Sequence, residues 1–105
     1  MANKSRKYSK IVFQKSAKKY CADVEGGNCC ENARIIGYPC HKGPNQKFHH
    51  NKTTKQLMSK SSGKCLERNR KSIIQKNCKS TKKSQKWTKK QIHTLKNHLP
   101  LVTPP

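Results

Sequence analysis

Residues 21–48 read CADVEGGNCCENARIIGYPCHKGPNQKF, and a weaker copy of this series returns at residues 65–87. Each copy has a cysteine, an acid two residues later, an Ile-Ile pair, a second cysteine and a Gln-Lys-aromatic triplet. Equivalent positions of the two copies lie 38 to 44 residues apart. A fixed order of residue types at a period of about 40 residues indicates an internal repeat. The sequence therefore predicts two copies of one structural unit.

The composition indicates one small domain that needs covalent links. The chain has 105 residues, of which 30% are hydrophobic, and its mean hydropathy is −1.09. A chain of this size and polarity cannot bury a large core and usually needs staples. Its six cysteines include no Cys-x-x-Cys pair. This spacing favours disulfides over a zinc site and implies an oxidising compartment.

The charge is strongly positive, because 25 lysines and arginines stand against four acids, for a formal net charge of +21. Such a surface binds polyanions, so nucleic acid, sulfated glycans and anionic membranes are candidate partners. Abundant lysine can also be a compositional bias without functional meaning. Three of the four acids, Asp23, Glu25 and Glu31, lie within nine residues. This cluster indicates a site, and the alternative is that the acids line a turn and pair with neighbouring lysines.

No segment reaches the roughly 18 apolar residues of a membrane span. The N-terminal residues are basic, but the apolar run 11–13 is too short for a signal peptide. Three explanations remain open: the signal has been removed, the chain is a fragment, or the thiols stay reduced. Because of the expected disulfides, we predict a secreted or cell-surface protein.

Short runs of β-branched and aromatic residues alternate with turn signals about every 8–12 residues. This pattern is typical of an all-β sandwich or barrel. Strands are expected at residues 11–14, 20–24, 33–38, 46–50, 56–58, 64–66, 72–75 and 85–87. We predict a basic flexible N-terminus at 1–9, a domain at 10–95 with repeats at 10–50 and 51–90, and a truncated third repeat or tail at 96–105.

The segment after Trp87 has two interpretations. Ile92, Leu95 and Leu99 fall at the spacing of one amphipathic helix face. They also lie where a third copy of the repeat would begin. The prolines that follow end any helix or central strand there.

These features resemble the ricin B-type lectins, which are sugar-binding β-trefoils with three repeats and a Gln-x-Trp mark in each. The mark is seen here at residues 46–48, with Phe in place of Trp, and at 85–87. The resemblance covers residues 10–95 and implies an incomplete β-trefoil with two of the three repeats. It also implies one disulfide in each repeat, Cys21–Cys40 and Cys65–Cys78.

The resemblance further implies a carbohydrate site in the first copy, formed by Asp23, Tyr38, Asn45 and Gln46. The apolar face of a sugar stacks on an aromatic ring such as Tyr38. An ionised Asp23 accepts charge-assisted hydrogen bonds from hydroxyls, and Asn45 offers both a donor and an acceptor. Gln46 is expected to support the site from behind. The implied ligand is galactose or N-acetylgalactosamine on glycans or glycoproteins.

The second copy departs from this pattern. Glu67 replaces the aspartate, Lys76 stands at the aromatic position, and Ser84 stands at the asparagine position. Only the glutamine, Gln85, is kept. We therefore expect the second copy to be structural and to have little affinity for sugar.

Other chemistry finds less support in the sequence. Cys29 and Cys30 have no counterpart in the second copy, and they pair with each other, bridge to another chain or stay free. Together with His41, His49 and His50 they follow no zinc template. No nucleophile and base occur in a recognisable local context. We expect no metal, no cofactor and no catalysis.

Two further interpretations remain. In one, the chain is a basic polyanion-binding protein that uses the lectin fold as a scaffold, with lysine runs at 4–19 and 79–90. In the other, the chain is a fragment or decayed copy that does not fold alone, because open sheet edges aggregate.

If the chain is a lectin, its single shallow sugar site is expected to bind weakly. Useful binding would then need multivalency, through self-association or a larger parent protein.

Overall fold

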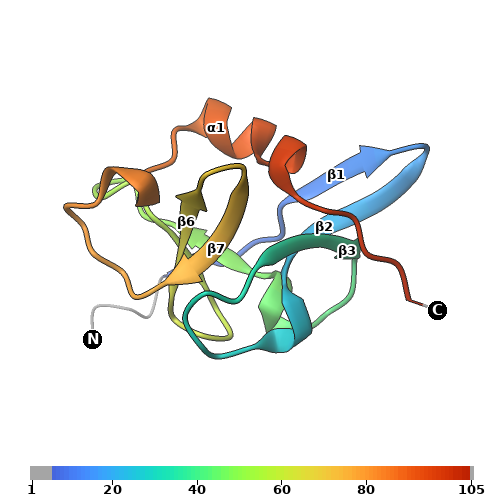
Figure 1. Cartoon of the computed structure of the whole chain (residues 1–105), viewed down its shortest axis with the longest axis horizontal. Coiled ribbons are helices and arrows are strands. Elements are labelled where there is room, and N and C mark those ends of the chain that lie inside the picture. The colour runs from blue at the N-terminus through green and yellow to red at the C-terminus, as the bar shows by residue number, and fades with distance from the viewer. Residues whose placement is uncertain (1–5, 105) are drawn as a thin grey trace.

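The computed structural model describes residues 6–104, which form two antiparallel sheets and a short helical segment near the C-terminus (Figure 1). The sheet orders are β1-β2-β3 and β4-β5-β6-β7, so strands that follow each other in sequence are neighbours in space. The strands are β1 (Val12–Lys15), β2 (Lys18–Val24), β3 (Ile35–Pro39), β4 (Phe48–His50), β5 (Leu57–Ser59), β6 (Cys65–Asn69) and β7 (Ser72–Lys76). The predicted all-β class is confirmed.

The apolar positions of the two repeats meet in one core. Ile35 and Ile73, which are equivalent in the repeat, are both buried, and Trp87 is 2% exposed. The indole Nε1 of Trp87 donates to the Leu66 carbonyl over 3.1 Å, so its one polar atom is satisfied. The core cluster consists of Phe13, Tyr20, Ala22, Val24, Ile35, Phe48, Leu57, Leu66, Ile73, Trp87, Leu95 and Leu99.

The two repeats are also joined by backbone hydrogen bonds. Asn32 donates to the Gln75 carbonyl over 2.8 Å, and Gln75 donates to the Ala33 carbonyl over 2.9 Å. An isolated bridge pairs Arg34 with Ile74 beside them. The segment that leads into β3 therefore lies against β7, and the two copies form one body.

Both disulfides implied by the repeat are present. Cys21–Cys40 links β2 to the end of β3, and Cys65–Cys78 links β6 to the loop after β7. Each bond ties the first strand of a hairpin to the segment that comes just after its second strand.

The two Gln-x-aromatic segments were expected to be strands, and this is wrong for both glutamines. Gln46 ends the 3₁₀ helix η3 (Pro44–Gln46), so the strand expected at 46–50 begins only at Phe48. Gln85 ends the equivalent 3₁₀ helix η4 (Lys83–Gln85), and no strand follows it at 85–87. The reason is that each turn aims the glutamine side chain into the protein, where it is fully buried.

The predicted flexible N-terminus at 1–9 contacts the second sheet at its last residue. Ser9 and Phe48 exchange two backbone hydrogen bonds of 2.9 Å each. Residues 1–5 of the predicted flexible segment lie outside the described residues.

Of the two interpretations of the segment after Trp87, the helix is the one that the structure shows. The helix α1 (Lys89–Thr94) begins with a capping box formed by Thr88 and Gln91, and the 3₁₀ helix η5 (Leu95–His98) continues it. Leu95 and Leu99 are buried against the core, and Ile92 packs at its edge. Within residues 6–104 no helix is long and apolar enough to cross a membrane.

After the helix, the chain returns to the first sheet. Gly37 donates to the Pro100 carbonyl, and Val102 donates to the Gly37 carbonyl, each over 2.8 Å. A Cβ atom at Gly37 would lie 2.7 Å from both Leu101 Cδ2 and Phe13 Cζ. This close approach requires glycine at position 37.

We predict that Gly37→Ala lowers the free energy of unfolding by about 1–3 kcal/mol, the usual cost of overpacking a filled site. Thermal denaturation followed by circular dichroism measures this. Adding Leu101→Ala should recover part of the loss, because it removes one of the two clashing groups. An unchanged melting temperature in Gly37→Ala would contradict the close packing.

Candidate functional site

A pocket of 500 Å³ opens on one face of the first sheet. The strand register puts Asp23 of β2 opposite Ile36 of β3, with Tyr38 two residues further along. Because side chains alternate along a strand, these three share one face. The pocket is lined by Asp23, Glu25, Gly26, Gly27, Ile36, Tyr38, His41, Asn45 and Val102. Three of the four predicted site residues therefore line a single pocket.

The carboxylate of Asp23 forms the floor of this pocket and is only 3% exposed. Its Oδ1 accepts from Asn45 Nδ2 over 3.1 Å, and its Oδ2 accepts from Gln46 Nε2 over 2.8 Å. Burial raises the pKa of Asp23 above its ordinary 3.8, and the hydrogen bond from Gln46 and the charge of His41 oppose this only in part. A carboxylate has about four acceptor positions, so both oxygens can still accept from a ligand.

Gln46 lies behind the pocket rather than in its wall, because its side chain is fully buried. Besides Asp23, its Nε2 donates to the Pro39 carbonyl over 3.0 Å. Its Oε1 accepts from the backbone N–H of His41 over 2.8 Å. Gln46 therefore joins the acid of β2 to both residues that flank the second cysteine.

His41 belongs to the pocket, although sequence reasoning considered it only as a metal ligand or surface residue. The backbone N–H of Gly43 donates to His41 Nδ1 over 2.8 Å. A neutral ring must then carry its proton on Nε2, which lies 3.5 Å from Asp23 Oδ2. The ring also meets Tyr38 edge-on, with 6.2 Å between centroids. The sequence feature that could have pointed to His41 is its position directly after the second cysteine of the repeat.

Only two of the three clustered acids, Asp23 and Glu25, line the pocket. Glu25 lines the pocket, but Arg34 donates to both of its carboxylate oxygens, and this hydrogen bonding lowers the pKa of Glu25. Glu31 accepts from the backbone N–H of Asn77 over 2.9 Å, which lowers its pKa. Two of the three acids thus have structural partners, but these are an arginine side chain and a backbone N–H, not the lysines that the alternative interpretation expected. Asp23 is the acid that meets the pocket without a lysine or arginine partner.

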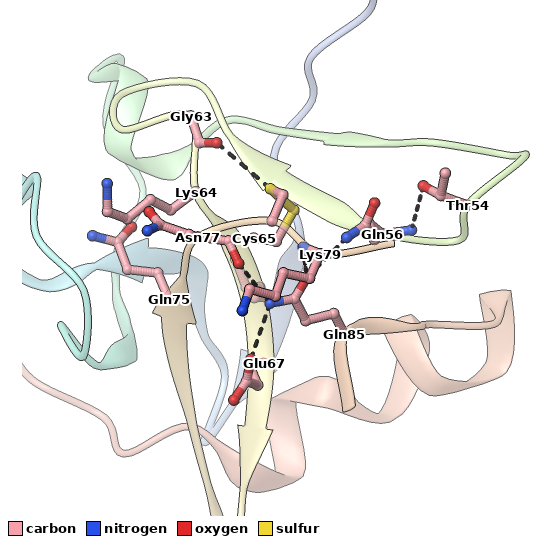
Figure 2. The surroundings of a disulfide bond; sticks show 12 residues. Thr54, Gln56, Gly63, Lys64, Cys65, Glu67, Gln75, Asn77, Lys79 and Gln85 are labelled. Carbon is pink, nitrogen blue, oxygen red and sulfur yellow. Dashed lines mark hydrogen bonds between the residues drawn. A yellow bond between two sulfur atoms is a disulfide. The ribbon is translucent and has the colours of Figure 1, made fainter. Parts of the chain in front are cut away.

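The second copy repeats the hydrogen bonds of the glutamine (Figure 2). Its acid, in contrast, is bound by a lysine. Gln85 Nε2 donates to Glu67 over 3.0 Å and to the Asn77 carbonyl over 2.9 Å, and its Oε1 accepts from the Lys79 backbone N–H over 2.9 Å. Lys82 Nζ then contacts both Glu67 oxygens at 3.0 Å. Burial raises the pKa of Glu67, but the bonds from Gln85 and Lys82 outweigh this and lower it.

The two remaining cysteines do not form a common site with His49 and His50. Cys29 and Cys30 are exposed and unbonded, with their Sγ atoms 3.2 Å apart. His49 bonds to the Lys7 carbonyl and His50 to the Trp87 carbonyl, away from both cysteines. Among residues 6–104, no three His, Cys, Asp or Glu side chains are close enough to hold a metal ion.

We predict that Gln46→Leu lowers the free energy of unfolding by about 2–4 kcal/mol, because it leaves a carboxylate, an N–H and a carbonyl without their partner. Gln85→Leu should cost at least as much, since Gln85 makes the three equivalent bonds and its Oε1 also accepts from Gln56 Nε2 over 2.8 Å. Urea denaturation of the oxidised protein measures both. Gln14→Leu, at an exposed position of β1, is the control and should change stability little; equal stability of all three variants would contradict the role of the two glutamines.

Comparison with known proteins is consistent with this geometry. The family model described as the ricin-type beta-trefoil lectin domain matches residues 5–97. No protein of curated function matches the chain.

Three solved structures have a similar fold. One is the β-trefoil lectin of the Vibrio vulnificus hemolysin/cytolysin with N-acetyl-D-lactosamine bound, at 24% identity and a TM-score of 0.68 over 80% of this chain and 63% of that one. The designed three-fold symmetric protein ThreeFoil follows at 25% and 0.66, covering 76% and 61%. The C-half of the earthworm R-type lectin in complex with GalNAc follows at 19% and 0.65, covering 77% and 62%.

The chain spans less than two thirds of the length of each of these structures. Its two sheets, each containing one disulfide-linked hairpin, correspond to part of a β-trefoil. The expected partial trefoil is confirmed.

Proposed function

The chain belongs to the ricin-type β-trefoil lectin family, and on this basis we propose that it binds galactose- or N-acetylgalactosamine-type glycans through the Asp23 pocket. The family consists of binding proteins rather than enzymes, which supports the expected non-catalytic role. The observation that carries the proposal is a buried carboxylate in the floor of a 500 Å³ pocket, with Tyr38 and Asn45 in its wall.

In this proposal each residue has one task. Asp23 accepts hydrogen bonds from two neighbouring hydroxyls, and charge-assisted bonds of this kind are the stronger ones. The ring of Tyr38 contacts the apolar C–H face of the sugar. Asn45 donates from its amide nitrogen to Asp23, and its side-chain carbonyl oxygen stays available as an acceptor for the sugar. His41 directs its Nε2 proton toward Asp23 Oδ2.

The second copy offers no comparable site, because Lys82 binds the Glu67 carboxylate and Lys76 stands at the position of the aromatic residue. One site in each chain implies weak binding to a single sugar. We propose that glycoprotein binding is strengthened by multivalency, through self-association or through further domains of a larger protein. The two disulfides support secretion or display at a cell surface.

The first test is binding to N-acetyl-D-lactosamine and GalNAc, the sugars named for two of the similar lectins. We expect Tyr38→Ala to weaken binding by about tenfold or more, since it removes the stacking ring while sparing the core. Tyr8→Ala, at another half-buried tyrosine, is the control and should bind normally. Glycan arrays and isothermal titration calorimetry measure this, and equal losses in both variants would contradict the site.

Asp23→Asn should abolish binding of these sugars, whereas Glu67→Gln, the equivalent change in the second copy, should leave it intact. The polyanion alternative predicts another outcome. Binding would then be restricted to sulfated glycans, would fade with added salt, and would be indifferent to Asp23. Comparing neutral and sulfated glycans at low and moderate salt distinguishes the two functions.

We also predict that sugar binding is lost on acidification at a pH above the ordinary pKa of aspartate. Only ionised Asp23 accepts from two hydroxyls, and burial raises its pKa above 3.8. Binding should therefore be full at neutral pH and should fall as the pH decreases through that raised pKa. Titration of affinity between about pH 3 and 7 tests this. A midpoint below 3.8 would contradict the assigned cause.

A further inference from the structure

A second pocket, of 410 Å³, lies between β1 and α1 on a different part of the molecule from the Asp23 pocket. Its walls come from β1 and the residues just before it, from β4 and β5, and from the helical segment near the C-terminus. We call it the β1–α1 pocket. It is lined by Ser9, Lys10, Ile11, Val12, Phe13, Phe48, His50, Leu57, Lys89, Ile92, His93 and Lys96. Its volume falls within the roughly 300–1,000 Å³ of small-molecule sites.

The interior of the β1–α1 pocket is apolar. Phe13, Phe48 and Leu57 are core residues that present one side to it. Ile92 packs at the edge of the core, and Val12 is 52% exposed. Covering such a surface with an alkyl or aryl group is favourable, because it removes apolar area from water.

The rim of the β1–α1 pocket is cationic. Lys10, Lys89 and Lys96 line it together with two histidines, and no acid does. Within residues 6–104 none of these three lysines forms an ion pair. The contrast with the Asp23 pocket is marked, since two of the four acids of the chain line that one.

From this combination we propose that the β1–α1 pocket binds a small anionic amphiphile. Its alkyl or aryl group would lie on Phe13, Leu57 and Ile92. Its carboxylate, sulfate or phosphate group would lie between Lys89 and Lys96, which can approach it because both side chains reach water. The same chemistry occurs in free fatty acids and in anionic lipids at a membrane surface.

The proposal differs from general attraction by a +21 surface because it requires both halves of the ligand. Each methylene that becomes buried should tighten binding by up to about fourfold. An anion without a tail should bind only weakly and lose its binding in salt. An uncharged alcohol of the same length should lack the contribution of the lysines.

The experiment titrates the whole oxidised chain with octyl sulfate, hexyl sulfate, methyl sulfate and octanol, followed by amide chemical shifts in NMR. We expect octyl sulfate to bind most tightly, with the largest shifts at Val12, Ile92 and His93. Equal affinity for octanol, or equal affinity for methyl sulfate, would overturn the proposal. So would shifts spread evenly over the lysine-rich surface.

A matched pair of charge reversals tests the site itself. Lys89→Glu should weaken octyl sulfate binding by about fivefold or more. Lys90→Glu makes the same change of net charge one residue further along α1, outside the pocket, and should have little effect. Both positions are exposed, so both variants should fold. Equal losses in the two would show a general charge effect and overturn the proposal.

Vesicles of anionic and of neutral phospholipid identify the source of the ligand. If Lys89→Glu also reduces binding to anionic vesicles more than Lys90→Glu does, the pocket takes membrane lipids. If the two variants bind vesicles alike while octyl sulfate distinguishes them, the pocket takes free amphiphiles. Neither result depends on Asp23, so the sugar site and the β1–α1 pocket can fail independently.

Discussion

One buried glutamine side chain holds each repeat in shape. In the first copy Gln46 donates to Asp23 and to the Pro39 carbonyl and accepts from His41. Gln85 makes the equivalent three bonds in the second copy. Each glutamine thereby joins the first strand of its hairpin to the two residues on either side of the second cysteine. The disulfide crosses the same gap, so one covalent and three polar links act at one place.

The same set of bonds has opposite consequences in the two copies. In the first, the acid is a short aspartate, and its oxygens lie in the floor of an open pocket beside Tyr38. In the second, the acid is a glutamate whose two oxygens are both bound by Lys82. The glutamine therefore serves folding in both repeats, and the partner of the acid decides whether a site is available. This explains why the chain can keep two structural repeats but one candidate sugar site.

Charge is distributed unevenly over this basic protein. The few acids have defined places: Asp23 in the first pocket, Glu25 with Arg34, Glu31 on Asn77, and Glu67 with Lys82. The β1–α1 pocket receives none of them and keeps its cations unpaired within the described residues. The acids and the unpaired lysines thus line two different pockets.

The sequence by itself determined the repeat and the all-β class, because both depend on residue order and on the alternation of strand and turn signals. The resemblance to the ricin B-type lectins, which the repeat carries, implied both disulfides and pointed to Asp23, Tyr38 and Asn45 as candidate site residues. For the segment after Trp87, the spacing of Ile92, Leu95 and Leu99 left a helix and a third repeat open.

The tertiary structure alone decided the rest. The turn before each glutamine, the proximity of His41 to Asp23 and the pairing of Lys82 with Glu67 all depend on contacts between segments far apart in the chain. The return of the C-terminal segment to Gly37 and the opening between β1 and α1 do so as well. Such contacts follow from how hairpins pack around a shared core, and no local pattern of residues encodes that packing.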